Sequence, residues 1–214
     1  MDFETKFFTG LIELHHGEKV EDRLRKISLK VDWAKGWPAD KRAFWNAEAF
    51  MWGYKIDKKL RTLIAREVEF LSKGKNLDLG CGSYSYVPSV GYDISEKMLQ
   101  FNDNCIKKIR GDVEKELPFS SGEFESCTAV FLLNYVENYE GLLKEIGRVL
   151  REGGMLIAVL YSGKVGVWQR QKEVNDFSAE RWKEILENEE FKVEGYEKDT
   201  LWFFRCVKQK VIKG

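Results

Sequence analysis

Two glycines and one aspartate lie close together in the chain, and their residue types and spacing are suited to binding a small ligand. Gly80 and Gly82 follow a predicted strand, Asn76–Leu79, and Asp93 follows a second predicted strand, Val90–Tyr92. Glycine lets a ligand approach the backbone closely, and a carboxylate ending the next strand can accept two hydrogen bonds from a ribose diol. The pattern therefore predicts a nucleoside site at one edge of a parallel sheet.

The same loop differs from two common phosphate-binding loops. Dinucleotide-binding folds carry Gly-x-Gly-x-x-Gly, and Ser85 stands where the third glycine would be. No Gly-Lys-Ser or Gly-Lys-Thr triplet follows, as a P-loop would require. We therefore expect no binding of nicotinamide dinucleotides. A Gly-x-Gly pair on its own also fits a tight strand-to-helix turn beside a surface aspartate, so the loop needs further support.

The elements that must position this loop are predicted from the spacing of apolar residues. After residue 75, short apolar runs alternate with helical stretches, which is typical of a parallel sheet covered by helices on both faces. We expect a helical cap over residues 1–74 and an α/β core over 75–214, within one compact unit. The expected core strands are 76–79, 90–92, 106–110, 126–133 and 155–161, with helices at 95–102, 139–150 and 178–188 and a closing antiparallel pair at 191–196 and 200–207.

Composition narrows the function. The 214 residues include 43% hydrophobic ones and carry 35 basic and 35 acidic side chains, so the strongly basic balance typical of nucleic-acid binding is absent. The four cysteines are scattered without a Cys-x-x-Cys pair, and we expect no metal site. The longest apolar runs are too short to span a bilayer. With no charged-then-apolar leader at the start, we expect no signal peptide and a cytoplasmic location.

A series of ordered motifs extends the glycine loop. Between residues 75 and 207 the chain resembles the class I S-adenosylmethionine-dependent methyltransferases, within the group that includes quinone-biosynthesis and other small-molecule methyltransferases. The motifs that carry the resemblance are Leu77-Asp78-Leu79-Gly80-Cys81-Gly82, Gly91-Tyr92-Asp93-Ile94-Ser95 with Met98-Leu99, Gly111-Asp112-Val113 with Leu117-Pro118-Phe119, Leu133-Asn134-Tyr135-Val136, and Leu150-Arg151-Glu152-Gly153-Gly154.

The resemblance implies a fold, a cofactor and a set of site residues. The fold is a Rossmann-like three-layer sandwich around a mostly parallel seven-stranded sheet of order 3-2-1-4-5-7-6, with an antiparallel last strand. The cofactor is S-adenosylmethionine, which becomes S-adenosylhomocysteine. The implied roles are Asp78, Gly80 and Gly82 against the methionine end, Asp93 on the ribose, Ile94, Asp112 and Val113 around the adenine, and Ala129 and Val130 along the methionine side.

The loop also departs from the family pattern. Tyr84 replaces the third loop glycine, and Asp93 comes sooner than the roughly 20 residues of the dinucleotide-binding analogue. Pro88 further limits any helix after the loop. We expect the aromatic and cationic segment from Trp37 to Trp45 to close the site in place of that helix; simple packing of its aromatic rings is the alternative.

No catalytic residue is predicted, because a sulfonium methyl is already electrophilic and needs a nucleophile held in line. If the acceptor is protonated, a base must lie nearby, and the polar candidates are Asn134, Tyr135, Tyr161 and the His15-His16 pair. For the two histidines, a solvated position on the surface is the better interpretation. The segment 162–177 leaves the fifth expected core strand where open sheets bind ligands, so it could be a flap over the acceptor or an exposed connector.

Three functions remain open. The first is methyl transfer to a small-molecule acceptor by a monomer or homodimer, with no nucleic-acid or membrane partner. The second is a non-catalytic regulator or subunit that binds S-adenosylmethionine, which the altered loop would permit. A nucleic-acid methyltransferase is the third; an exocyclic-amine enzyme of that type would carry an Asn-Pro-Pro-Tyr-like motif where Leu133-Asn134-Tyr135 stands.

Overall fold

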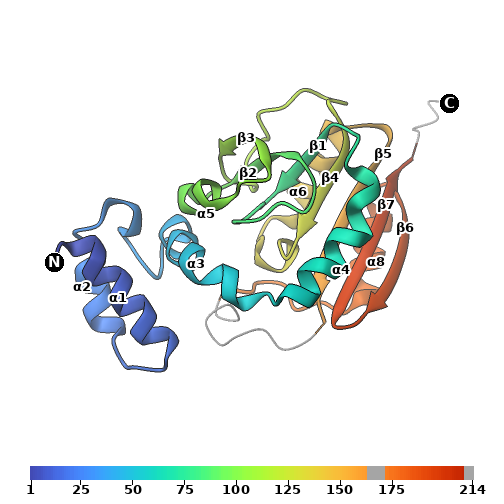
Figure 1. Cartoon of the computed structure of the whole chain (residues 1–214). Coiled ribbons are helices and arrows are strands. Elements are labelled where there is room, and N and C mark those ends of the chain that lie inside the picture. The colour runs from blue at the N-terminus through green and yellow to red at the C-terminus, as the bar shows by residue number, and fades with distance from the viewer. Residues whose placement is uncertain (163–171, 210–214) are drawn as a thin grey trace.

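The structure is a computed structural model that describes residues 1–162 and 172–209. Its centre is a seven-stranded sheet of order β3-β2-β1-β4-β5-β7-β6, in which β7 runs antiparallel to both neighbours (Figure 1). The predicted α/β class and strand order are confirmed. The strands are β1 Asn76–Leu79, β2 Ser89–Asp93, β3 Cys105–Arg110, β4 Phe124–Val130, β5 Leu150–Tyr161, β6 Phe191–Lys198 and β7 Leu201–Lys208.

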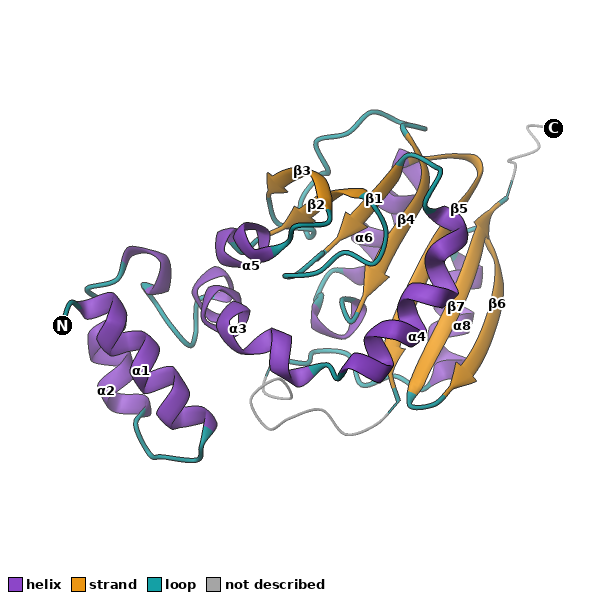
Figure 2. Cartoon of the chain, in the orientation of Figure 1, coloured by secondary structure: helices purple, strands orange, loops and turns teal. Residues whose placement is uncertain are grey.

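Helices cover both faces of this sheet (Figure 2). The α-helices are α1 Phe3–His15, α2 Glu21–Ser28, α3 Lys41–Lys55, α4 Lys58–Val68, α5 Glu96–Phe101, α6 Tyr139–Val149 and α8 Ala179–Asn188, and the short 3-10 turns are η1 Asp32–Ala34, η2 Glu69–Leu71 and η3 Leu133–Tyr135. None of the helices within the described ranges is both long and apolar enough to cross a membrane.

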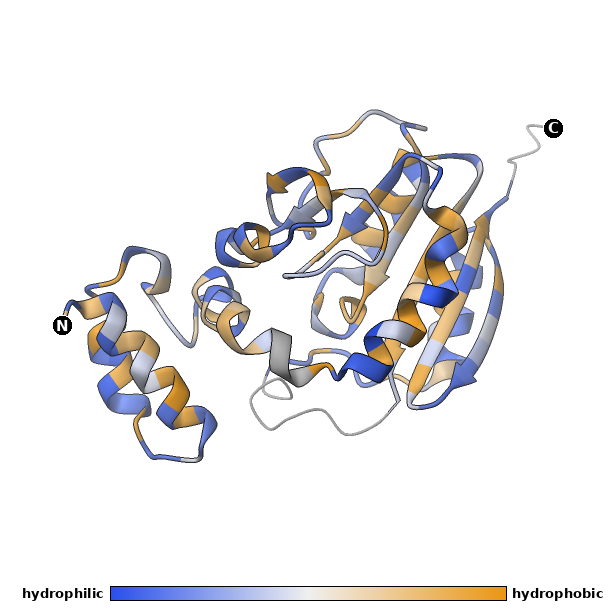
Figure 3. Ribbon diagram, in the orientation of Figure 1, coloured by the Kyte–Doolittle hydropathy of each residue, from blue (hydrophilic) through white to orange (hydrophobic). Residues whose placement is uncertain are grey.

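Two apolar clusters hold the layers together. On one face, Leu142 of α6 and Trp182 of α8 pack with Leu77 of β1. On the other face, Ile64 of α4 packs with Val159 of β5. Figure 3 shows hydrophobic colouring along much of the central strands, whereas the helices carry both hydrophobic and hydrophilic colouring. Because both faces of β5 are covered, its later part from Met155 to Leu160 is a continuous apolar run.

Several element boundaries differ from the expected ones for local reasons. Within the expected helical cap of residues 1–74, the last α-helix ends at Val68 and is followed by η2 from Glu69. The expected strand 126–133 ends at Val130, because Phe131 has φ +56°, a left-handed conformation that extended strands do not accommodate. The helix expected at 139–150 is present as α6, and the Asn138 side chain caps its start by accepting the Gly141 backbone N–H at 3.1 Å.

The N-terminal helices build a cluster of their own and reach the sheet through α3. Phe7 of α1 and Leu24 of α2 are fully buried with Trp37 and Ala47 in this cluster. Figure 1 shows α1 and α2 at one end of the molecule, with α3 between them and α5. The division into a cap at residues 1–74 and a core from 75 stays a prediction. The contacts establish that α3 packs on α5 at the sheet edge, where Lys97 of α5 also reaches Glu4 and Trp33.

Candidate functional site

A cavity lies at the carboxyl ends of β1, β2 and β4, the edge where open α/β sheets bind ligands. Eight of the nine predicted site residues line it. The ninth, Ala129, is fully buried within the core beside it. The residues lining the cavity are Lys41, Trp45, Trp52, Ile56, Arg61, Asp78, Gly80, Cys81, Gly82, Tyr84, Tyr86, Asp93, Ile94, Met98, Asp112, Val113, Val130, Phe131, Leu132, Tyr135 and Val136.

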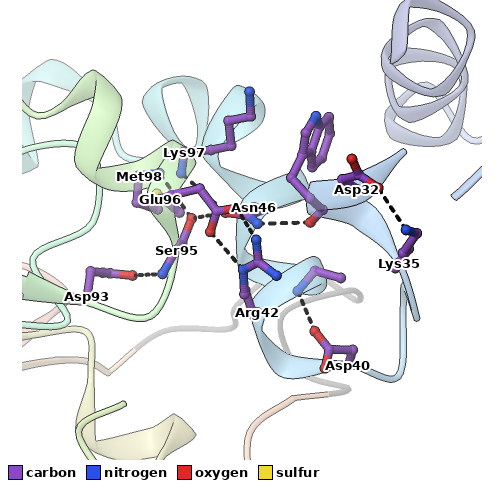
Figure 4. Close-up of polar contacts among 12 residues, drawn as sticks. Asp32, Lys35, Asp40, Arg42, Asn46, Asp93, Ser95, Glu96, Lys97 and Met98 are labelled. Atoms are coloured by element: carbon purple, nitrogen blue, oxygen red, sulfur yellow. Dashed lines mark hydrogen bonds and ion pairs between the residues drawn. The ribbon is translucent and has the colours of Figure 1, made fainter. Parts of the chain in front are cut away.

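Asp93 ends β2 and ties the glycine loop to the start of α5. One carboxylate oxygen accepts the Gly82 backbone N–H at 2.9 Å, and the other accepts the Ser95 N–H at 2.8 Å. Figure 4 shows the second of these bonds beside the contacts of α3. Although the Asp93 side chain lies at the rim of the sheet, these two bonds to backbone N–H groups give it a structural role in addition to any role in binding.

Burial sets the charge state of two carboxylates on this cavity. Asp93 is 7% exposed and Asp78 is 3% exposed. Desolvation raises the pKa of each side chain to about 6, and for Asp78 the nearby charge of Asp93 adds to the effect. The Thr128 hydroxyl opposes the shift by donating to Asp78 Oδ1 at 2.6 Å. Two buried carboxylates make this side of the cavity favourable for a cationic or hydrogen-bond-donating ligand.

The glycine loop turns sharply without a helix after it. Gly80 and Gly82 have φ of +56° and +57°, which glycine adopts readily. A Cβ at Gly80 would lie 2.5 Å from Leu132 Cδ1, so the loop also needs the small residue for packing. Residues 80–88 contain turns and bends only, so the prediction that the usual helix is missing is confirmed.

Asn102 supports the loop from the other side. This fully buried side chain follows α5 and donates from Nδ2 to the carbonyls of Cys81 at 3.3 Å and Gly82 at 3.0 Å. Its Oδ1 accepts the Ser85 backbone N–H at 3.2 Å. The network holds the loop where a following helix would otherwise do so. Nothing in the sequence indicated this role, because Asn102 lies 20 or more positions beyond the carbonyls that it binds.

The N-terminal segment contributes one wall of the cavity, through only part of the expected Trp37–Trp45 segment. Lys41 and Trp45 of the expected segment line the cavity, and the Trp45 ring packs edge-on against Tyr135 at 5.1 Å. Trp37 does not line it; this ring instead packs on Phe7 at 5.7 Å in the N-terminal cluster.

Further cavity residues were missed in the sequence. Trp52, Ile56 and Arg61 line the cavity although no motif contains them. For the first two a signal existed: Lys41, Trp45, Trp52 and Ile56 recur at helical spacing and share one face of α3 and its end. Arg61 comes from the next helix, and its place beside the loop follows from tertiary packing.

Salt bridges fix α3 against the core. The Lys41 ammonium lies 2.7 Å from the Glu114 carboxylate, and Arg42 pairs with Glu96 at the start of α5 (Figure 4). The Arg42 hydrogen bonds hold the pKa of Glu96 at about 2 against the opposing effect of desolvation. Since Glu96 is partly exposed, this pair contributes positioning more than stability.

The candidate acid–base groups are spread over the molecule. Tyr135 lines the cavity, and burial raises the pKa of its hydroxyl. Asn134 donates from Nδ2 to Glu173 Oε1 at 3.3 Å, whereas Tyr161 packs on the α4 face of the sheet. His15 and His16 are exposed at the end of α1. Tyr135 is therefore the only one of these named candidates that the structure places on the cavity.

The predicted flap at 162–177 falls largely on residues 163–171, which lie outside the described residues. Its described end lies against η3. The backbone N–H groups of Val174 and Asn175 both bind the Asn134 carbonyl, at 2.8 and 3.2 Å. The Asn175 side chain donates to the carbonyls of Leu133 and Val136. The chain returning from β5 is thus anchored next to the cavity.

Comparison with known proteins supplies the family. A methyltransferase-domain family model matches residues 77–158, from β1 into β5. Over these residues the chain matches a methyltransferase domain, and its sheet order is that of the class I S-adenosylmethionine-dependent methyltransferase fold. A demethylmenaquinone methyltransferase from Staphylococcus saprophyticus is 32% identical over 119 residues, which are 48% of this chain and 51% of that protein. The sterol 4-C-methyltransferase strm-1 of Caenorhabditis elegans is 29% identical over 126 residues, 49% of this chain and 37% of that protein.

Solved methyltransferase structures share the fold. A putative methyltransferase from Haloferax volcanii, solved with the activator Trm112, matches with a TM-score of 0.62 at 16% identity and covers 78% of this chain and 98% of its own. A methyltransferase from Thermotoga maritima matches with a TM-score of 0.56 at 18% identity, covering 76% and 97%. The chain spans about half the length of the first curated relatives it matches.

The residues of the cavity fit the cofactor of this family, S-adenosylmethionine. Asp93 offers carboxylate oxygens for ribose hydroxyls, and Ile94 and Val113 offer apolar walls for a flat base. Gly82 keeps space open toward α3, since a Cβ there would lie 3.6 Å from the Trp52 indole nitrogen. The two buried carboxylates also suit a ligand that carries a sulfonium and an ammonium group.

Proposed function

We propose that this chain transfers a methyl group from S-adenosylmethionine to a small-molecule acceptor. The observation that carries the proposal is the cavity itself, in which a helix-free glycine loop and the buried carboxylates of Asp78 and Asp93 face aromatic side chains of α3. When bound, the cofactor supplies an electrophilic methyl group. The protein's task is then to hold the acceptor in line and to exclude water.

Each cavity residue has a proposed part in binding. Asp93 would accept hydrogen bonds from the ribose, and Ile94 and Val113 would enclose the adenine. Asp112 would accept from the adenine amino group, which its half-buried position at the cavity permits. Gly80 and Gly82 would let the ligand lie against the backbone.

Aromatic side chains mark the acceptor side. Trp45, Trp52, Phe131 and Tyr135 line the cavity together, and Phe131 holds a left-handed backbone conformation there. Non-glycine residues in this conformation cluster at functional sites. Since burial raises the Tyr135 pKa, its hydroxyl is protonated at neutral pH and acts as a hydrogen-bond donor. A ring-containing acceptor fits such walls, and two relatives are named for demethylmenaquinone and a sterol.

Calorimetry and a turnover assay test the proposal. Calorimetry should show binding of S-adenosylmethionine and S-adenosylhomocysteine and much weaker binding of NAD. Release of S-adenosylhomocysteine should then be followed with a panel of phenolic, quinol-type and amine acceptors. Tighter binding of NAD would contradict the proposal. Binding without turnover on any acceptor, with or without a partner protein, would favour the regulatory alternative.

A further inference from the structure

We propose that Arg61 binds the carboxylate at the methionine end of the cofactor, with Tyr84 positioning its guanidinium. This inference rests on the proposed function. It assigns a role to a helix outside the matched domain and to the tyrosine that replaces the third loop glycine.

The need for such a residue follows from the loop. A helix N-terminus after a glycine loop provides backbone N–H groups and partial positive charge for an anion. Here residues 80–88 form turns and bends, so this source of positive charge is missing. Asp78 and Asp93 lie on the same cavity with raised pKa values, so their field is unfavourable for another carboxylate. A cation on the cavity wall would offset this field.

Two cationic side chains line the cavity among the described residues, and they lie on different sides. Lys41 pairs with Glu114 at 2.7 Å, two residues beyond Asp112 and therefore on the side assigned to the adenine. Arg61 lines the cavity together with Tyr84 and borders Tyr86 of the same loop. The glycine loop is the side assigned to the methionine end. Position therefore favours Arg61.

The guanidinium of Arg61 is held in place before any ligand arrives. Its Nε donates to the Ile56 carbonyl at 3.2 Å, just before α4 begins. Its Cζ lies 5.4 Å from the centre of the Tyr84 ring, within the range of a cation–π contact. The Tyr84 ring packs edge-on against Tyr86 at 5.2 Å, which steadies it in turn. A planar guanidinium held in position is well suited to recognise a carboxylate by charge and hydrogen bonding.

Packing of α4 does not by itself require this arginine. The helix is fixed to the sheet by Ile64 and Val68, both fully buried. Arg66 lies on the same helix with its side chain exposed, and it borders only a neighbouring groove, which Arg61 also lines, and not the cavity itself. Arg66 is therefore a matched control for removing a positive charge from α4.

The test compares two ligands that differ at the proposed contact. S-adenosylhomocysteine carries the amino-acid end, and 5′-methylthioadenosine lacks it. Calorimetry on the full chain should show that Arg61→Gln weakens S-adenosylhomocysteine about 10- to 100-fold, as expected for loss of charged hydrogen bonds. The same variant should bind 5′-methylthioadenosine within about twofold of wild type. Arg61→Lys should recover part of the loss, and Arg66→Gln should change neither affinity.

Comparing two ligands on one variant separates recognition from folding. A partly unfolded variant would lose both ligands in proportion, so the ratio of the two Kd values reports the contact alone. An unchanged ratio in Arg61→Gln would overturn the role of Arg61 and leave the proposed function standing. Wild-type protein that binds neither nucleoside would overturn the proposed function, and this inference with it. Tyr84→Leu should shift the ratio in the same direction by a smaller factor.

Discussion

The Asn46 side chain of α3 accepts a hydrogen bond from the Ser95 hydroxyl at 2.7 Å, and both side chains are fully buried. Asn46 also donates to the Trp33 carbonyl at 2.9 Å and accepts the Lys97 backbone N–H at 3.2 Å (Figure 4). Ser95 stands two residues after Asp93. One buried amide therefore connects the N-terminal cluster, α3 and the turn that carries the proposed ribose ligand.

Replacing the Asn46 amide should lower the stability of the fold. Asn46→Ala leaves the Ser95 hydroxyl and the Lys97 N–H without their partner, so the free energy of unfolding should fall by about 1–3 kcal/mol. Denaturant unfolding measures the change. Lys35→Ala, which breaks the exposed Asp32–Lys35 pair, is the control and should have no measurable effect. Equal stability of Asn46→Ala and wild type would show that the hydrogen bonds of Asn46 do not stabilise the packing of α3 on α5.

The tryptophans of the N-terminal segment should separate into two classes. Trp45→Ala removes an aromatic wall and its contact with Tyr135, so S-adenosylhomocysteine should bind about five- to thirtyfold more weakly, or 1–2 kcal/mol. Trp37→Ala should instead lower the free energy of unfolding by about 3–5 kcal/mol, because the ring fills the N-terminal cluster. The affinity of the folded Trp37→Ala protein should stay near that of wild type. Calorimetry and thermal unfolding measure the two effects. Unchanged affinity in Trp45→Ala together with weaker binding in folded Trp37→Ala would refute the proposed cavity wall.

Asp93 should be important for both binding and folding. Asp93→Ala should weaken S-adenosylhomocysteine about ten- to several-hundredfold, because ligand hydroxyls lose a charged acceptor. It also leaves the Gly82 and Ser95 N–H groups unpaired, so unfolding should become easier by about 1–3 kcal/mol. Asp93→Asn keeps the size of the side chain, so its affinity and its stability should lie between those of wild type and Asp93→Ala. Undiminished affinity in Asp93→Ala would place the nucleoside elsewhere.

Cofactor affinity should depend on pH near 6. Burial raises the pKa of Asp78 and Asp93 to about 6, so both are protonated more readily in the folded chain than in the unfolded one. Their contribution to stability is therefore present below about pH 4 and is lost as the pH rises through 6. Binding has the opposite sign, because ribose hydroxyls and a sulfonium favour the charged carboxylates.

Between about pH 7.5 and about pH 5, affinity should fall by roughly tenfold for each carboxylate that must be charged. Calorimetry in buffers of different ionisation enthalpy should detect proton release on binding near pH 6. Asp93→Asn should reduce that release, whereas exposed Asp32→Asn should leave it unchanged. If the affinity does not change across this pH range, the protonation of Asp78 and Asp93 does not control cofactor binding.

The sequence predicted the parts of this molecule that depend on local pattern. Apolar runs located the strands, and the spacing of apolar residues located α6, because each pattern is determined by neighbouring residues. The glycine loop and Asp93 were found because a nucleoside site needs them at adjoining strand ends. Ala129 was assigned along the same strand as Val130, yet successive side chains of a strand face opposite ways, so only Val130 lines the cavity.

Features that depend on distant contacts were missed. Asn102 supports the loop across 20 or more intervening positions, and asparagine after a short helix has no pattern that would reveal it. Trp37 and Trp45 lie in one aromatic segment, and only the turn before α3 sends one ring to the N-terminal cluster and the other to the cavity. The left-handed Phe131 also ends β4 earlier than its apolar run suggests.

The bond between Asn46 and Ser95 joins residues 49 positions apart, and the Lys41–Glu114 pair spans 73. Long loops must close before such contacts can form, so they are completed late in folding. During synthesis, α3 leaves the ribosome well before the β2–α5 turn that it packs on has been made. The aromatic wall of the cavity consequently has no surface to pack on until the chain has been extended beyond Glu114. Binding of a nucleoside in this cavity would therefore require that these long-range contacts have already formed.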